Sequence, residues 1–324
     1  MRVRRSIETV LGTPEAHLLK RRERAVARRP LSEAIAAIAA RREGHAAPDD
    51  EPLFLLSAGW RSGSTLVQRL VNSGADYFLW GEPYSRADLV PRLADSLRPI
   101  TDAWPRPDDV LHKHDGALED RWTANLHPDL ETLLESHRAL LRTLCAPPPG
   151  SPPDSGWGFK EVRLAADHAL YLNLLFPRAK FVFLVRDPLD AYASYKTWRS
   201  WYVRWPEEQI RTAWSYARLW NGLAGGFLAE AATVGGIVIR YEDLVPGGPA
   251  ITALEGLLGA RLDERMLANR ISGSDDGPTH LSALERRIIA RRTAPTARRL
   301  GYAEGWQTGF EPATAGTTSR SSTN

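Results

Sequence analysis

Apolar residues fall along the chain in two alternating patterns, short continuous runs and longer stretches at helical spacing. Continuous apolar runs of about four to eight residues, bounded by turn residues, are typical of strands that are buried on both faces. Five segments have this character, and they predict strands at residues 53–56, 77–80, 157–160, 180–185 and 235–240.

Helical spacing of apolar residues follows directly after the first of these runs and recurs between the others. It predicts helices at residues 64–72, 89–97, 128–144, 165–175, 249–258 and 281–292, and an aromatic-rich helical region at 192–220. Strands that alternate with helices form a parallel sheet with helices on both faces. We therefore predict an α/β fold of three layers, with a central parallel sheet of about five strands flanked by helices.

The domain organisation follows from changes in composition. Residues 1–50 are basic and helical in pattern, with a weak apolar stripe, and we expect a docked extension or a dimer arm. Residues 51–312 hold all five predicted strands and form the α/β domain. Residues 313–324 are rich in Ser, Thr and Gly, which predicts a disordered tail.

A turn of small residues joins the first strand to its helix, and its composition is typical of an anion-binding site. Glycine lets the backbone approach an oxyanion, and the N–H groups of the first helical turn point toward it. Ser62, Ser64 and Thr65 add hydroxyl donors, and Arg61 adds a positive charge. The alternative is a tight strand-to-helix turn with a capping serine and no ligand.

The spacing of this turn differs from that of the ATP-type phosphate loop. That motif has four residues between its glycines, followed by Gly-Lys-Ser/Thr. Three residues separate Gly59 from Gly63, and Ser64 stands where the lysine would be. The cation, Arg61, precedes the second glycine instead.

Polar residues stand at or just past the end of each predicted strand. They are Ser57, Glu82, Lys160, Arg186 and Tyr241. Ligands of parallel α/β sheets bind beyond the carboxyl ends of the strands. We therefore expect these five side chains to converge on one site.

Composition excludes several classes of protein. The 324 residues are 43% hydrophobic and 25% charged, as in soluble globular proteins, and no apolar run reaches the length of a membrane helix. Charged residues interrupt any signal-peptide core near the N-terminus, so we expect a cytoplasmic protein that does not associate with membranes. The single cysteine, Cys145, excludes an internal disulfide, and no cluster of residues has metal-ligand spacing, so no metal is expected.

A second motif makes the functional interpretation of the turn at 61–65 more specific. The strand at 180–185 is followed by Arg186-Asp187-Pro188, with Ser194 eight positions beyond the arginine. With Arg-Ser-Gly-Ser-Thr at 61–65, this resembles the sulfotransferase family that uses 3'-phosphoadenosine 5'-phosphosulfate (PAPS), in its bacterial or carbohydrate-type branch. The resemblance covers about residues 53–245 and implies a P-loop-type fold.

The resemblance implies roles for individual residues. It assigns PAPS, and its product 3'-phosphoadenosine 5'-phosphate (PAP), to Arg61, Ser62, Gly63, Ser64, Thr65, Arg186, Ser194 and Tyr241. The turn at 61–65 would hold the 5'-phosphosulfate, with Arg61 at the leaving oxygen. Arg186 and Ser194 would hold the 3'-phosphate, and Tyr241 would lie on the adenine side.

The catalytic base is harder to assign. The cytosolic branch of the family has Lys-x-His after the third strand, but Lys160 is followed by Glu-Val. Glu82, which precedes a proline, matches the glutamate of the carbohydrate-type and bacterial branches, and His112 and His114 are alternatives. Lys160 either assists at the bridging oxygen or only pairs with Glu82.

The chain also departs from the family. Leu66 replaces the tryptophan that often closes the turn motif, and the C-terminal Arg-Lys-Gly-x-x-Gly clasp is absent. The aromatic segment 198–220 is either an acceptor pocket or helix packing. We expect a hydroxyl acceptor on a small molecule or carbohydrate, no nucleic acid partner, and a possible homodimer. The alternatives are a nucleotide-dependent kinase with Asp187 on Mg²⁺, and a non-catalytic nucleotide- or RNA-binding protein that uses its basic ends.

Overall fold

The computed structural model describes residues 29–42, 48–74, 76–111, 118, 122–198, 210–268 and 280–302. Its sheet has five parallel strands in the order β2-β3-β1-β4-β5. Their bounds are Leu53–Ser57 (β1), Tyr77–Trp80 (β2), Gly156–Glu161 (β3), Lys180–Val185 (β4) and Ile237–Arg240 (β5). Every predicted strand is present, and β1 lies at the centre of the sheet between β3 and β4.

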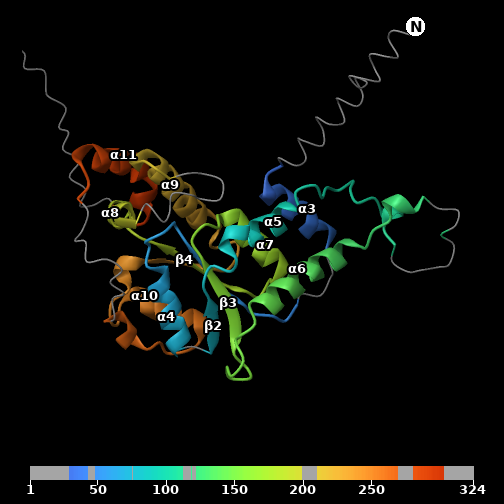
Figure 1. Cartoon of the computed structure of the whole chain (residues 1–324), viewed down its shortest axis with the longest axis horizontal. Helices are drawn as coiled ribbons and strands as arrows, with labels where there is room; N and C mark the ends of the chain where they lie inside the picture. Colours follow the sequence, from blue (N-terminus) through green and yellow to red (C-terminus); the bar gives the residue numbers. More distant parts are fainter. Residues whose placement is uncertain are drawn as a thin grey trace, which may run out of the picture.

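Helices cover both faces of this sheet, as Figure 1 shows. They are α3 (Leu31–Arg41), α4 (Ser64–Gly74), α5 (Leu89–Asp95), α6 (Leu130–Leu144), α7 (Ala166–Leu175), α8 (Pro188–Trp198), α9 (Ala213–Glu230), α10 (Pro249–Leu258) and α11 (Ala283–Arg299). Side chains of a strand alternate between its faces. Phe54 and Leu56 of β1 join a core with α7 and α9, and Leu53 and Leu55 join a second core with α4 and α10. The predicted three-layer α/β fold is therefore confirmed.

Several element boundaries differ from the prediction, and two of these differences have a clear physical cause. The last helix, α11, continues past Pro295 to Arg299 instead of ending at residue 292, since Thr293, Thr296 and Ala297 are buried on its inner side against α9. Strand β5 begins at Ile237, after Gly235 has turned the chain with a φ of 63°.

The described part of the N-terminal extension packs onto the α/β domain. Leu31, Ile35 and Ile38 of α3, the predicted apolar stripe, are buried in the core that contains α7. The predicted helical arm at 1–28 and the predicted disordered tail at 313–324 lie outside the described residues.

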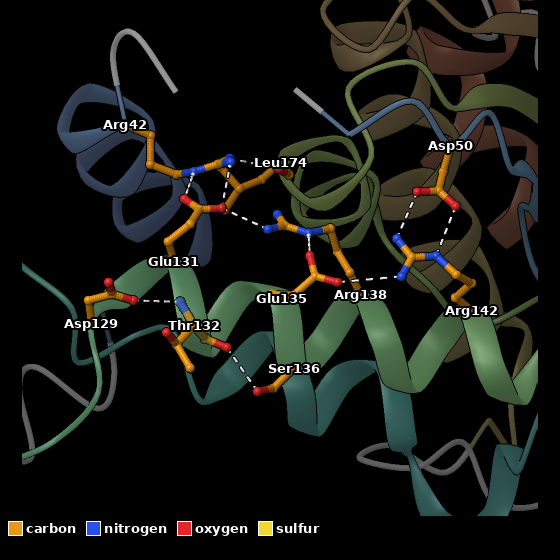
Figure 2. Close-up of polar contacts among 10 residues, drawn as sticks. All are labelled: Arg42, Asp50, Asp129, Glu131, Thr132, Glu135, Ser136, Arg138, Arg142 and Leu174. Atoms are coloured by element: carbon orange, nitrogen blue, oxygen red, sulfur yellow. Dashed lines mark hydrogen bonds and ion pairs between the residues drawn. The ribbon is translucent and has the colours of Figure 1, made fainter. Parts of the chain in front are cut away.

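A charged network on α6 joins this extension to the domain (Figure 2). Glu131 accepts hydrogen bonds from Arg42, at the end of α3, and from Arg138 on its own helix, at 2.7 Å each. Arg142 donates hydrogen bonds to both carboxylate oxygens of Asp50, at 2.9 and 2.7 Å. Asp50 lies in the segment that leads into β1. This bidentate bond lowers the pKa of the Asp50 carboxyl. The network therefore fixes α6 to two segments that precede the sheet.

A buried histidine on the same helix makes stability depend on pH. His137 is 6% exposed, its Nδ1 lies 3.0 Å from Tyr171 Oη, and burial lowers its pKa from the ordinary 6.5. The unfolded chain therefore binds a proton that the folded protein excludes, and stability falls as the pH falls below that value. We expect the urea midpoint to decrease between about pH 7 and pH 5.

His137→Gln tests whether His137 causes this pH dependence, because the glutamine amide can still form a hydrogen bond with Tyr171 but does not titrate. The variant should lose part of the pH slope. A smaller slope should remain, since burial also lowers the pKa of His168. A wild-type midpoint that stays constant over this pH range would contradict the prediction.

Candidate active site

A cleft of about 910 Å³ opens at the carboxyl edge of the sheet. Its lining includes eight residues singled out from the sequence: Arg61, Gly63, Ser64, Thr65, Glu82, Lys160, Arg186 and Tyr241. They come from the ends of β3, β4 and β5, the turn after β1 and the segment after β2. Parallel strands direct their carboxyl ends to one edge of the sheet, which brings these distant residues together.

The turn between β1 and α4 is shaped by three residues in the left-handed region. Gly59, Arg61 and Gly63 have φ values of 89°, 64° and 93°. Ser62 is buried inside the turn, where its hydroxyl donates to the Gly59 carbonyl at 2.9 Å and contacts the hydroxyl of Ser57. The hydroxyls of Ser57 and Ser62, which we expected at the site, therefore hold the turn together and do not line the cleft.

The second glycine allows a close approach that no other residue permits. A Cβ atom on Gly63 would collide with the ring of Tyr241, which comes from the end of β5. Helix α4 begins at the next residue, Ser64, and both Ser64 and Thr65 line the cleft. The first amides of an eleven-residue helix and two hydroxyls therefore meet at the floor of the cleft, an arrangement suited to an oxyanion.

Arg186 reaches this turn from the end of β4. Its Nη1 donates to the Arg61 carbonyl at 2.9 Å, and its guanidinium lies over the Tyr241 ring, 4.5 Å from the centroid. The Nε of Arg186 is buried and makes no hydrogen bond within the described chain. A buried donor without a partner is costly, so this guanidinium has capacity for a further acceptor.

The carboxylates of Glu161 and Asp187, near the ends of β3 and β4, accept hydrogen bonds from other groups. Glu161 accepts from Arg163 at 3.0 Å. Asp187 caps α8, where its Oδ1 accepts from the amides of Leu189 at 2.7 Å and Asp190 at 3.2 Å.

The two motifs also meet through a second contact. Arg61 Nε donates to the hydroxyl of Ser194 at 2.9 Å, across the boundary between the β1 turn and α8. Ser194 itself does not line the cleft. Arg61 of the first motif therefore contacts Ser194 of the second motif. In return, Arg186 of the second motif contacts the backbone of the first.

Glu82 and Lys160 form an ion pair on the wall of the cleft. Lys160 Nζ lies 2.6 Å from Glu82 Oε1, and the two side chains are 10% and 26% exposed. The sequence left open whether Lys160 pairs with Glu82, and this contact shows that it does. A charge-assisted bond of this length fixes the direction of the Glu82 carboxylate while leaving it open to the cleft.

The rest of the lining was not predicted from the sequence, in which Leu66 was noted only as a departure from the family motif. It comprises Trp60, Leu66, Arg69, Val162, Glu242, Leu244, Val245, Pro246, Glu264, Leu267 and Ala268. A signal for Arg69 existed, because it stands one helical turn after Thr65 and therefore shares its face of α4. No local signal marked the apolar wall formed by Val245 and Leu267.

Other candidates are buried elsewhere or lie outside the described chain. Tyr216 and Trp220 of the aromatic segment are core residues, packed with Tyr192 and Tyr302 respectively. His112 and His114 lie outside the described residues. Within the described ranges, no group of three or more His, Cys, Asp or Glu is placed to hold a metal ion. No helix among the described residues is long and apolar enough to cross a membrane.

Comparison with known proteins identifies the family. Solved structures of similar fold include a sulfotransferase from Alicyclobacillus acidocaldarius, at 14% identity and a TM-score of 0.43, covering 77% of this chain and 94% of that one. A sulfotransferase from Mycobacterium avium is 18% identical, with a TM-score of 0.40 and 83% of each chain covered. The sulfotransferase domain from the curacin biosynthetic pathway is 16% identical, with a TM-score of 0.39, covering 78% of this chain and 98% of that one.

No curated protein matches the chain in sequence. The sequence model described as "Sulfotransferase family" matches residues 52–249, which include both motifs, every strand of the sheet and most of its helices. Because this match covers more than half of the chain, the protein belongs to the sulfotransferase family.

Proposed function

We propose that the protein transfers the sulfuryl group of PAPS to a hydroxyl group of a small-molecule or carbohydrate-like acceptor. One observation carries this proposal: the guanidinium of Arg186 lies against the turn at 61–65, within the same cleft. Two positive side chains and a helix N-terminus at one edge of a sheet suit a ligand with two phosphate groups.

The residues present fit the donor nucleotide. Gly63, Ser64 and Thr65, with the first amides of α4, would hold the 5'-phosphosulfate. Arg186, whose Nε makes no hydrogen bond among the described residues, would hold the 3'-phosphate, and Ser194 would act with it. When bound, PAPS supplies an activated sulfuryl group with a phosphate as its leaving group. Ser62 would contribute its backbone, because its hydroxyl is used within the turn.

Charge stabilisation at the leaving oxygen falls to Arg61 and Lys160. As the acceptor oxygen bonds to sulfur, the bond from sulfur to the phosphate oxygen breaks and that oxygen gains negative charge. Preorganised cations stabilise such a developing charge and need no reorganisation at the moment of reaction. The bond of Arg61 to Ser194 and that of Lys160 to Glu82 hold both in advance.

Glu82 would remove the proton of the acceptor hydroxyl. A general base must be ionised and must reach the proton that it takes. The Glu82 carboxylate lines the cleft and bonds Lys160 through one oxygen, so its other oxygen can accept the proton. Lys160 would thus serve two neighbouring groups, the base and the leaving oxygen.

The two alternative functions make different demands on the site. A kinase would need Asp187 as a Mg²⁺ ligand, but this carboxylate caps α8. A nucleic acid-binding protein would use the exposed arginines of α11, which lie on a helix that contributes nothing to the cleft lining. Neither alternative accounts for the contact between the two motifs.

Transfer of radiolabelled sulfate tests the proposed function directly. The protein, labelled PAPS and a panel of phenolic, aliphatic and sugar hydroxyls should give PAP and a labelled product. ATP with Mg²⁺ in place of PAPS should give no phosphorylated product. Phosphorylation without sulfation would support the kinase. Steeply salt-dependent RNA binding with no sulfated product would support the nucleic acid-binding alternative.

A further inference from the structure

The peptide group between Arg186 and Asp187 is held at both of its polar atoms. The Arg186 carbonyl accepts a hydrogen bond from Trp220 Nε1 of α9 at 3.0 Å. The Asp187 amide donates to Glu242 Oε1, just after β5, at 2.9 Å. A peptide group is planar, so fixing both sides sets the orientation of the Arg186 backbone, and with it the direction in which the side chain leaves.

A single residue near the end of the described chain contacts both of these side chains. Tyr302, which follows α11, donates its hydroxyl to Glu242 Oε2 at 2.8 Å. Its ring packs edge-on against Trp220, with centroids 6.5 Å apart and an interplanar angle of 64°. The guanidinium of Arg240 also packs on the Tyr302 ring, 5.0 Å from its centroid. Tyr302 is 7% exposed, so these contacts are shielded from water.

This arrangement explains why an acidic residue lines an anion-binding cleft. Glu242 would repel a phosphate group if its oxygens faced the ligand. One oxygen instead accepts from the Asp187 amide and the other from Tyr302, so both are directed to the protein. The carboxylate can therefore hold the backbone beside Arg186 without offering an oxygen to the ligand.

We propose that Trp220, Glu242 and Tyr302 form a bracket that positions Arg186 for the 3'-phosphate of the donor nucleotide. Glu242 and Tyr302 are then positioning residues, and the segment that follows α11 takes part in donor selection although it contributes nothing to the cleft lining. The inference rests on the proposed function, because it needs Arg186 to contact the 3'-phosphate.

Tyr302→Phe is the most selective test, because it removes one hydroxyl and keeps the ring contacts. Affinities for PAP and for adenosine 5'-phosphate are measured by calorimetry, since these ligands differ only in the 3'-phosphate. We expect PAP to bind about fivefold more weakly, the effect of one lost hydrogen bond, while adenosine 5'-phosphate binds as before. A merely structural role would leave the ratio of the two affinities unchanged.

Tyr171→Phe is the matched control. Its hydroxyl is also buried and bonded, to His137 at 3.0 Å, but it lies between α6 and α7 and away from the cleft. This variant should lose thermal stability and keep the wild-type preference for PAP.

A double-mutant cycle shows whether Tyr302 acts through Glu242. Glu242→Ala should weaken PAP binding more than Tyr302→Phe, and adding Tyr302→Phe to it should cost little further. Glu242→Gln should recover much of the loss, since its amide oxygen can accept from Asp187 and its amide nitrogen can donate to Tyr302. Fully additive effects would overturn the bracket.

Failure of the inference and failure of the proposed function are distinguishable. A wild-type protein that does not prefer PAP over adenosine 5'-phosphate would overturn the proposed function. A wild-type protein that prefers PAP, with an unchanged preference in Tyr302→Phe, would overturn only the bracket.

Discussion

Arg186→Ala is expected to weaken PAP binding by about 100-fold or more, the size of effect seen when one partner of a desolvated charge pair is removed. The guanidinium is half-buried, stacked on Tyr241, and has an Nε with capacity for an acceptor. The loss should appear for PAP and be small for adenosine 5'-phosphate, because the 3'-phosphate is the group that Arg186 would hold. Calorimetric titration of both ligands measures the difference.

Two further variants separate charge, geometry and stability in this experiment. Arg186→Lys keeps the charge but loses the planar fork, so an intermediate loss is expected. Arg142→Ala removes an arginine that pairs with Asp50, remote from the cleft, and should leave both affinities unchanged. An equal loss for both nucleotides in Arg186→Ala would mean that Arg186 only supports the turn at 61–65.

Glu82→Gln is expected to lower turnover by about 10²–10⁴-fold, the usual contribution of a general base. Glutamine keeps the shape of the side chain and can still accept a hydrogen bond from Lys160, but it cannot take a proton from the acceptor. Affinity for PAP should stay within about threefold of wild type, since the base contacts the acceptor side. Steady-state rates at saturating donor, together with PAP titration, separate the two effects.

Glu33→Gln is a suitable control for this variant. Glu33 pairs with Arg29 on the surface of α3, so turnover should not change. Turnover of Glu82→Gln close to wild type would remove Glu82 from the mechanism and direct attention to His112 and His114.

The sheet could be predicted because its strands are covered on both faces. Continuous runs such as Leu53–Ser57 have no polar alternation to obscure them, and β1, β2 and β4 begin at the predicted residues. Boundaries that depend on packing could not be predicted in this way. Helix α11 continues through Pro295 because its inner side is buried against α9, a contact between segments far apart in sequence.

The site was predictable where one strand end or one turn supplies the residue, as for Gly63, Lys160 and Arg186. Side-chain direction was not predictable. The pattern of the turn does not show that the Ser62 hydroxyl points inward. Glu242 gave no signal either, because its part in the site depends on Tyr302, which lies 60 positions away in the chain.

In the proposed enzyme, the two motifs bind opposite ends of an adenosine that carries 3'- and 5'-phosphate groups. The most direct measurement is a thermal-shift titration of the wild-type protein with PAP, compared with ADP in the presence of Mg²⁺. A ligand that binds only the folded state raises the melting temperature, and the rise increases with the concentration and the affinity of the ligand. We expect a concentration-dependent rise with PAP and a much smaller one with ADP. A rise with ADP and Mg²⁺ that equals or exceeds the rise with PAP would contradict this expectation.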